Sequence, residues 1–239
     1  MISHKHKCIF IHIPKAAGTS IERFFMEDLG LDMENRHALL LGANTNKHIG
    51  PRRVSHLTIR EMIEGHYISQ DLLEDYYKFA FVRNPFTRIF STYKYLKYHR
   101  FISFDVFVQN KIDELIRSER YGYFLKPQFQ YIYSEDLNLM VDFVGKLENI
   151  GEDFKTVQHH LNFNKLPLKH FNKSNRSSSN SAFFGLSKFI IKEKKSVVKN
   201  LSLKKDKAFI LSENGQQKLI NIYKNDFELF NYPKELSPK

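Results

Sequence analysis

The chain has 239 residues, of which 42% are hydrophobic and 14% aromatic, enough for a sizeable core, so we predict one domain over residues 1–239. Its formal net charge of +11 favours anionic partners without choosing among them. The lone cysteine excludes an internal disulfide framework, and no apolar run approaches the ~18 residues of a membrane span, so we expect a cytoplasmic protein.

The first predicted elements are a strand and a helix close to the N-terminus. The β-branched and apolar residues of Lys7–Ile13 are typical of a central parallel strand. A helix is expected over Ile21–Leu29, because apolar residues repeat there at helical spacing. Thr19 or Ser20 can cap the start of this helix, and Gly30 is suited to its end.

The turn between that strand and helix, Pro14–Ser20, has the sequence PKAAGTS and the composition of an anion site. Its small residues let the backbone close around a ligand, and unpaired amides at a helix start attract phosphate or sulfate. Lys15 adds a positive charge. In a nucleoside-triphosphate loop the lysine follows the second glycine, whereas Lys15 precedes Gly18. The chain shows no matching strand that ends in a metal-binding aspartate, so we expect no metal.

A second segment of the same kind follows after a long loop. The expected elements are a loop over Asp32–Arg53, helices over Ser55–Ile63 and Gln70–Tyr77, a strand over Phe79–Val82, and a helix over Pro85–Tyr98. Arg83 stands where this strand ends, and ligands gather at the carboxyl edge of parallel sheets. Its planar guanidinium suits phosphate. Helical spacing lets Arg83 and Ser91 face the same phosphate.

The remaining elements complete an alternation of strands and helices. They are a helix over Phe104–Glu119, an irregular aromatic segment over Tyr121–Tyr133, a strand over Val141–Leu147, a helix over Ile150–Leu161, a helix over Asn214–Phe230, and a tail expected to fray from Tyr232. This order predicts an α/β fold with a central, mostly parallel sheet flanked by helices.

A Lys-rich insert is expected over residues 183–212, before the last helix. Its basic part, Lys188–Lys207, is either a solvated face or a surface for an acidic acceptor or a membrane. We find no RNA-binding or zinc-finger pattern, so no nucleic-acid partner is expected.

With both anion-binding segments in view, the chain resembles the sulfotransferases that use 3′-phosphoadenosine 5′-phosphosulfate (PAPS), especially the carbohydrate group with heparan-sulfate 2-O-sulfotransferases and bacterial relatives. IFIHIPKAAGTS (9–20) is similar to the 5′-phosphosulfate loop of that family, and FVRNPFTRIFSTY (81–93) to its 3′-phosphate motif. Three further stretches look like later landmarks of the family: KLENIGEDF (146–154), HFNKSNR (170–176) and IYKNDFELFNY (222–232). The resemblance implies a P-loop-like three-layer fold and metal-free transfer to a hydroxyl, with a glycan or glycolipid as acceptor.

The resemblance also implies individual roles at the nucleotide. Lys15 contacts the 5′-phosphosulfate and steadies the leaving oxygen. Arg83 and Ser91 hold the 3′-phosphate of the donor, and of the product 3′-phosphoadenosine 5′-phosphate. The 5′ end is held by the backbone amides of Ala17, Gly18, Thr19 and Ser20. The residues that close over the nucleotide are Asn172, Ser174 and Arg176.

The general base is assigned by the same resemblance to a histidine ahead of the second strand, and His56 fits that position. Histidine suits proton transfer near neutral pH. Glu61 and Glu64, expected on the same helix, are alternatives. His12 lies on the first strand and is expected in the core or behind the reacting groups.

Two other functions remain open. A metal-dependent nucleotide kinase would need magnesium and would bind ATP. A basic protein that keeps a catalytically dead nucleotide fold would bind the nucleotide without turnover. Small phenols or amines stay open as acceptors, and the sequence predicts no oligomeric state.

Overall fold

The computed structural model describes residues 1–46, 48–163 and 209–236. At its centre is a sheet with strands in the order β1 (Ile2–Ser3), β2 (Cys8–Ile11), β3 (Tyr77–Val82) and β4 (Phe143–Lys146). β2, β3 and β4 run parallel, and β1 pairs antiparallel with β2. The three expected strands and the mostly parallel sheet are confirmed. β1 was not predicted, because two residues are too short to show an alternating pattern.

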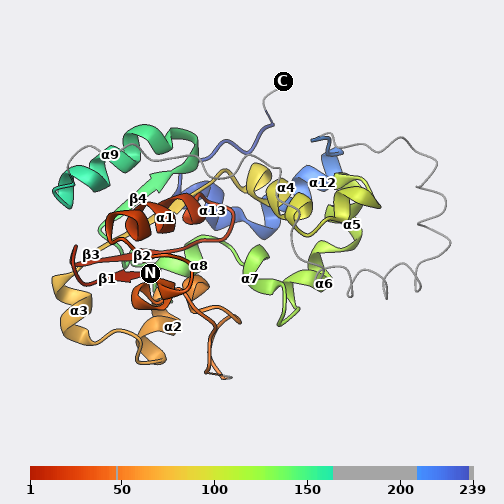
Figure 1. Cartoon of the computed structure of the whole chain (residues 1–239). Coiled ribbons are helices and arrows are strands. Elements are labelled where there is room, and N and C mark those ends of the chain that lie inside the picture. Colours follow the sequence, from red (N-terminus) through yellow and green to blue (C-terminus); the bar gives the residue numbers. More distant parts are fainter. Residues whose placement is uncertain (47, 164–208, 237–239) are drawn as a thin grey trace.

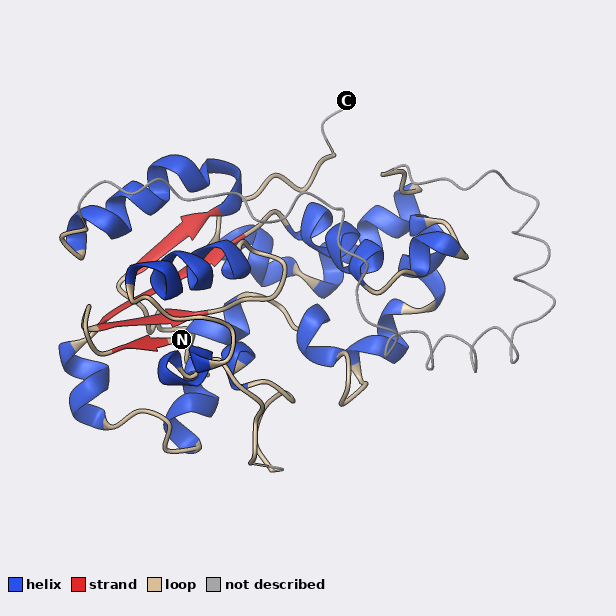
Figure 2. Ribbon diagram, viewed as in Figure 1, coloured by secondary structure: helices blue, strands red, loops and turns tan. Residues whose placement is uncertain are grey.

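The two faces of the sheet carry separate apolar cores, because successive side chains of a strand point to opposite faces. Cys8, Phe10, Phe79 and Phe81 pack against α1 (Gly18–Asp28) and α9 (Ile150–His160). Ile9, Ile11, Ala80 and Val82 join the larger core on the opposite face. Figure 1 shows α1 and α9 on one side of the sheet and α2 and α8 on the other, and Figure 2 shows the strands between two helical layers. The expected three-layer α/β fold is therefore confirmed.

The other α-helices of the described residues lie outside the α1 and α9 layer. They are α2 (Ile59–Glu64), α3 (Gln70–Asp75), α4 (Pro85–Tyr95), α5 (Phe104–Asn110), α6 (Ile112–Ile116), α7 (Gly122–Leu125), α8 (Phe129–Ile132), α12 (Glu213–Ile222) and α13 (Lys224–Leu229). The α4 to α7 segment and α12 extend beyond the carboxyl edge of the sheet (Figure 1).

Three helix predictions need correction. The expected helix over Phe104–Glu119 divides at Lys111, which has φ −121° and separates α5 from α6. The expected last helix divides at Tyr223, whose buried hydroxyl donates to the Leu125 carbonyl at 2.7 Å. The segment over Tyr121–Tyr133, expected to be irregular, contains α7 and α8. The bond made by Tyr223 joins segments 98 positions apart, and a helical period does not report such a contact.

The predicted end of α1 is correct, but its predicted start is not. Gly30 has φ 65°, its amide donates to Glu27, and the Leu31 amide donates to Met26. This pair of bonds is the Schellman motif that a glycine favours, so the predicted stop is confirmed. The predicted start is wrong, as the site geometry shows below.

The chain packs on the core just before α12, at the end of the predicted insert, and again after α13, where the tail was predicted. Phe209 packs against Phe90 with ring centroids 5.0 Å apart, and Leu211 is buried. Tyr232 is only 9% exposed, so the predicted fraying is wrong at that residue. Lys188–Lys207 lies outside the described residues. No described helix combines the length and apolar character needed to cross a membrane.

Candidate functional site

The turn after β2 has an unusual backbone. Lys15 and Ala17 both have φ 69°, in the left-handed region that non-glycine residues avoid. Each such residue costs on the order of 1 kcal/mol and persists only where its surroundings enforce it. The turn is therefore held in a defined shape, of the kind that directs successive amides to one point.

Helix α1 begins at Gly18, with Ala17 as N-cap and no side-chain cap. The prediction that Thr19 or Ser20 caps the helix is therefore wrong. The Ser20 amide donates to the Ala17 carbonyl at 2.9 Å. Within the described residues, the amides of Ala17, Gly18 and Thr19 have no hydrogen-bond acceptor. An uncapped helix start leaves these donors open to an anion.

Gly18 is small for a reason that the sequence did not reveal. A Cβ atom at this position would lie 1.9 Å from Nε2 of His12. Glycine is thus required by the close approach of an imidazole ring. His12 follows β2, is buried as expected, and its Nδ1 lies 2.6 Å from Oε1 of Glu22 on α1.

Arg83, directly after β3, is fixed through its backbone. Its amide donates to Oε1 of Gln128 at 2.9 Å, and Nε2 of Gln128 donates to its carbonyl at 2.8 Å. Gln128 is itself buried, and its amide and that of Phe129 donate to the buried carboxylate of Asp226. Burial raises the pKa of Asp226, while the charge of Arg88 and these amides oppose that rise.

The Arg83 side chain extends toward the first turn. Its Nε donates to Oγ1 of Thr87 at 2.9 Å, and its Nη1 donates to the Lys15 carbonyl at 3.4 Å. No described residue is a hydrogen-bond partner of Nη2. The guanidinium thus stands beside the first turn with donors left for a ligand.

Lys15 and Ser91 both lie near one face of α4. The Lys15 ammonium lies 4.2 Å from the ring centroid of Tyr95. Thr87, Ser91 and Tyr95 follow at intervals of four and share one face of the helix. Ser91 therefore lies between the residue that receives Arg83 and the ring that holds Lys15. Burial, and then the charge of Arg83, lower the pKa of Lys15 to about 8.

His56 lies in a 3₁₀ turn, Val54–His56, ahead of α2 and outside it, so the predicted helix over Ser55–Ile63 begins too early. The carbonyl of His12 accepts a hydrogen bond from Nδ1 of His56 at 3.4 Å. This assigns the proton to Nδ1 and leaves Nε2 as the proton acceptor. Burial, and then the nearby His12, lower the pKa of His56 well below 6.5. The neutral, basic form therefore dominates at pH 7.

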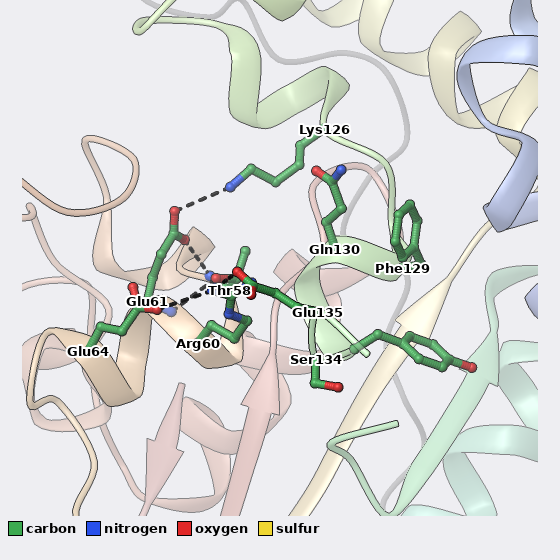
Figure 3. A pocket seen from close by; sticks show the side chains of 10 residues that line it. Thr58, Arg60, Glu61, Glu64, Lys126, Phe129, Gln130, Ser134 and Glu135 are labelled. Atoms are coloured by element: carbon green, nitrogen blue, oxygen red, sulfur yellow. Dashed lines mark hydrogen bonds and ion pairs between the residues drawn. The ribbon is translucent and has the colours of Figure 1, made fainter. Parts of the chain in front are cut away.

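The two alternative bases are already paired. Glu61 completes the cap of α2 by accepting from the Thr58 amide at 2.7 Å, and it also binds Lys126 at 3.2 Å. Glu64 binds Arg60 at 3.4 Å. Both carboxylates line a pocket between α2 and α8, as Figure 3 shows. The volume of this pocket is about 370 Å³. It is lined by Thr58, Arg60, Glu61, Glu64, Lys126, Phe129, Gln130, Tyr133, Ser134 and Glu135.

Arg88 is the residue that sequence reasoning missed. It is fully buried, donates to the carbonyls of Phe124 and Lys126 at 3.2 and 2.6 Å, and reaches the Pro14 carbonyl at 3.5 Å. It thereby ties the first turn to the backbone around α7. Only its place in RNPFTR, one turn after the strand, could have pointed to it.

Two of the later landmark segments meet at the second turn. Glu148 accepts from the Asn84 amide and from the Tyr232 hydroxyl, both at 2.9 Å. Asn84 also caps α4 by accepting from the amide of Phe86 at 3.0 Å. Ser174 and Arg176 lie outside the described residues.

Comparisons with known proteins give one match. The profile of a family described as the sulfotransferase family matches residues 1–233. No curated protein and no solved structure gives a significant match. The matched range includes both turns, His56 and Arg88.

Proposed function

The chain belongs to the sulfotransferase family, and we propose that it moves the sulfuryl group of PAPS to a hydroxyl of a carbohydrate acceptor. The observation that carries this proposal is the contact between the two turns. Nη1 of Arg83 reaches the Lys15 carbonyl at 3.4 Å, so a guanidinium stands next to an open helix start. A nucleotide with anions at both its 3′ and 5′ positions matches such a pair of neighbouring sites.

In this proposal the 5′-phosphosulfate lies on the open amides of Ala17, Gly18 and Thr19, beside Ser20, whose amide donates to the Ala17 carbonyl. Arg83 and Ser91 hold the 3′-phosphate, and Ser174 and Arg176 are proposed to close over the nucleotide. The position of Ser91 on α4 supports its proposed role at the 3′-phosphate. It shares one helix face with Thr87, which accepts from Arg83, and with Tyr95, whose ring contacts Lys15.

The chemistry assigned to the site is an in-line displacement. The acceptor oxygen forms a bond to sulfur while the bond from sulfur to the 5′-phosphate oxygen breaks. Nε2 of His56 takes the acceptor proton, which is worth roughly 10²–10⁴-fold in rate. Lys15 and the helix-start amides stabilise the charge that grows on the departing phosphate. 3′-Phosphoadenosine 5′-phosphate then leaves.

A glycan or glycolipid acceptor is proposed on the likeness of both motifs to the carbohydrate group. The positive net charge is compatible with an acidic glycan. We propose a cytoplasmic enzyme from the single cysteine, which is buried in β2. Membrane contact through Lys188–Lys207 stays a prediction.

The test is transfer of ³⁵S from labelled PAPS to a panel of polysaccharides, glycolipids and phenols, in chelator. We expect label in a polysaccharide or glycolipid. Label in phenols alone would overturn the acceptor class. A thermal shift with ATP and magnesium, and none with 3′-phosphoadenosine 5′-phosphate, would favour the kinase. A shift with the latter nucleotide, but no transfer to any acceptor, would favour a dead nucleotide-binding fold.

A further inference from the structure

The pair formed by His12 and Glu22 is buried beside the site and has no role in the chemistry assigned above. Nδ1 of His12 lies 2.6 Å from Oε1 of Glu22, and the two side chains are 8% and 15% exposed. Glu22 stands one helical turn after Gly18 on α1. The hydrogen bond therefore connects the end of β2 to the first turns of α1. The open amides of Ala17, Gly18 and Thr19 at the start of this helix are called the anion cradle below.

His12 contacts both halves of the site. Its ring fills the space in front of Gly18, where a Cβ atom would come within 1.9 Å of Nε2. The same ring stands edge-on to His56, with centroids 4.4 Å apart, and its carbonyl accepts from Nδ1 of His56. His12 thus lies between the anion cradle and His56, the proposed base, and contacts both.

A packing role alone does not account for this pair. Burying two ionisable groups costs desolvation, and an apolar side chain of similar volume would often be as stable or more so. What the carboxylate adds is direction, because a hydrogen bond to Nδ1 fixes the rotation of the imidazole ring. An apolar side chain at position 22 would leave the rotation of the His12 ring, which stands edge-on to His56, to packing alone.

We propose that His12, held by Glu22, is a positioning residue that fixes His56 at a set distance from the anion cradle with Nε2 free. This inference rests on the proposed function, in which His56 takes the acceptor proton. Rate depends steeply on such placement, since a displacement of about 1 Å can cost on the order of 10²-fold.

The test compares two changes at Glu22. In Glu22→Gln the amide oxygen still accepts from Nδ1 of His12, so kcat should stay within about threefold of wild type. In Glu22→Leu the acceptor is gone, and kcat should fall about tenfold to a hundredfold. The KM for PAPS and the Kd for 3′-phosphoadenosine 5′-phosphate should change less than about twofold. Glu27→Gln, an exposed carboxylate on the same helix, is the control.

A second readout needs no activity. In protein labelled with ¹⁵N-histidine, the imidazole shifts of wild type should show His12 and His56 each with the proton on Nδ1. Glu22→Leu should show a mixture of tautomers at His12, whose Nδ1 then lacks its acceptor. If that variant does not fold, His12→Phe fills the ring space without the hydrogen bond and should give the same kcat loss.

Three results would overturn the inference: an unchanged tautomer, an unchanged kcat, or a loss of nucleotide affinity that explains the lower rate. A wild-type protein without any sulfuryl transfer would instead contradict the proposed function. The tautomer measurement would still decide the role of Glu22 in that case.

Discussion

Arg83 and Lys15 are 68 positions apart in sequence, yet Nη1 of Arg83 donates to the Lys15 carbonyl at 3.4 Å. The sheet explains the contact, because β2 and β3 are parallel and paired with Ile11 opposite Ala80. Continuing that register brings the turns after both strands to the same edge. The two cationic segments are neighbours as a consequence of topology.

Binding of 3′-phosphoadenosine 5′-phosphate should weaken as pH rises through about 8, because the pKa of Lys15 is lowered to about 8. An anionic ligand stabilises the ammonium, so only the protonated form binds well, and the loss approaches about tenfold per pH unit above the pKa. Calorimetric titration between roughly pH 7 and 9.5 measures this, with the ligand phosphates fully ionised. Lys15→Arg should give a flat profile, since arginine keeps its charge. A flat wild-type profile would refute the assignment.

His56→Ala should lower kcat by roughly 10²–10⁴-fold and leave nucleotide affinity unchanged. In wild type, kcat/KM should fall on the acid side with a midpoint below 6.5, because burial, His12 and Arg53 all lower the pKa of His56. Protonation below that pKa removes the base. His66→Ala, an exposed histidine, is the control. Near-wild-type turnover of His56→Ala would exclude it as the base.

Much of this geometry could be predicted from local sequence. The apolar runs that end at Pro14 and Arg83 predicted two parallel strands, and turn chemistry predicted where the cations stand. What could not be predicted depends on tertiary contacts. The ring of His12 lies against Gly18 because of the shape of the turn between them, and the carbonyls around Arg88 come from distant segments. No periodicity in the sequence reports either contact.

The helix start at Gly18 shows why one sequence rule failed. Thr19 and Ser20 are good caps in general, but the left-handed backbone of Ala17 starts the helix before them. The backbone shape of the turn thus decided the boundary. The same shape leaves the amides uncapped, so the failed prediction lies at the candidate anion site.

Arg88→Met should destabilise the fold by about 3–5 kcal/mol, because it removes the Arg88 donors from the carbonyls of Pro14, Phe124 and Lys126 and leaves Asp226 without a nearby positive charge. Urea unfolding measures this as a lower midpoint at unchanged slope. Arg60→Met removes two exposed ion pairs, to Glu64 and Glu135, and should leave the midpoint almost unchanged. Equal, small losses in both variants would show that Arg88 is dispensable to the fold.

Gly18→Ala should destabilise the protein by about 1–3 kcal/mol and lower kcat, since the new methyl group must displace the His12 ring. Gly151→Ala in α9 is a matched control, because its Cβ would meet nothing within 4 Å. That change should be neutral or stabilise by up to about 1 kcal/mol. Thermal unfolding and steady-state rates give both values, and a Gly18→Ala variant with wild-type properties would contradict the packing.

The central claim is that one nucleotide binds with its 3′-phosphate at Arg83 and its 5′ end at Gly18. Calorimetric titration with 3′-phosphoadenosine 5′-phosphate and with adenosine 5′-phosphate tests it directly. Wild type should prefer the former, and Arg83→Ala should weaken that ligand alone by about tenfold to a hundredfold, the loss of a charge-assisted contact. Exposed Arg117→Ala should change neither. Equal affinity of wild type for the two ligands, or equal loss of both in Arg83→Ala, would contradict the claim.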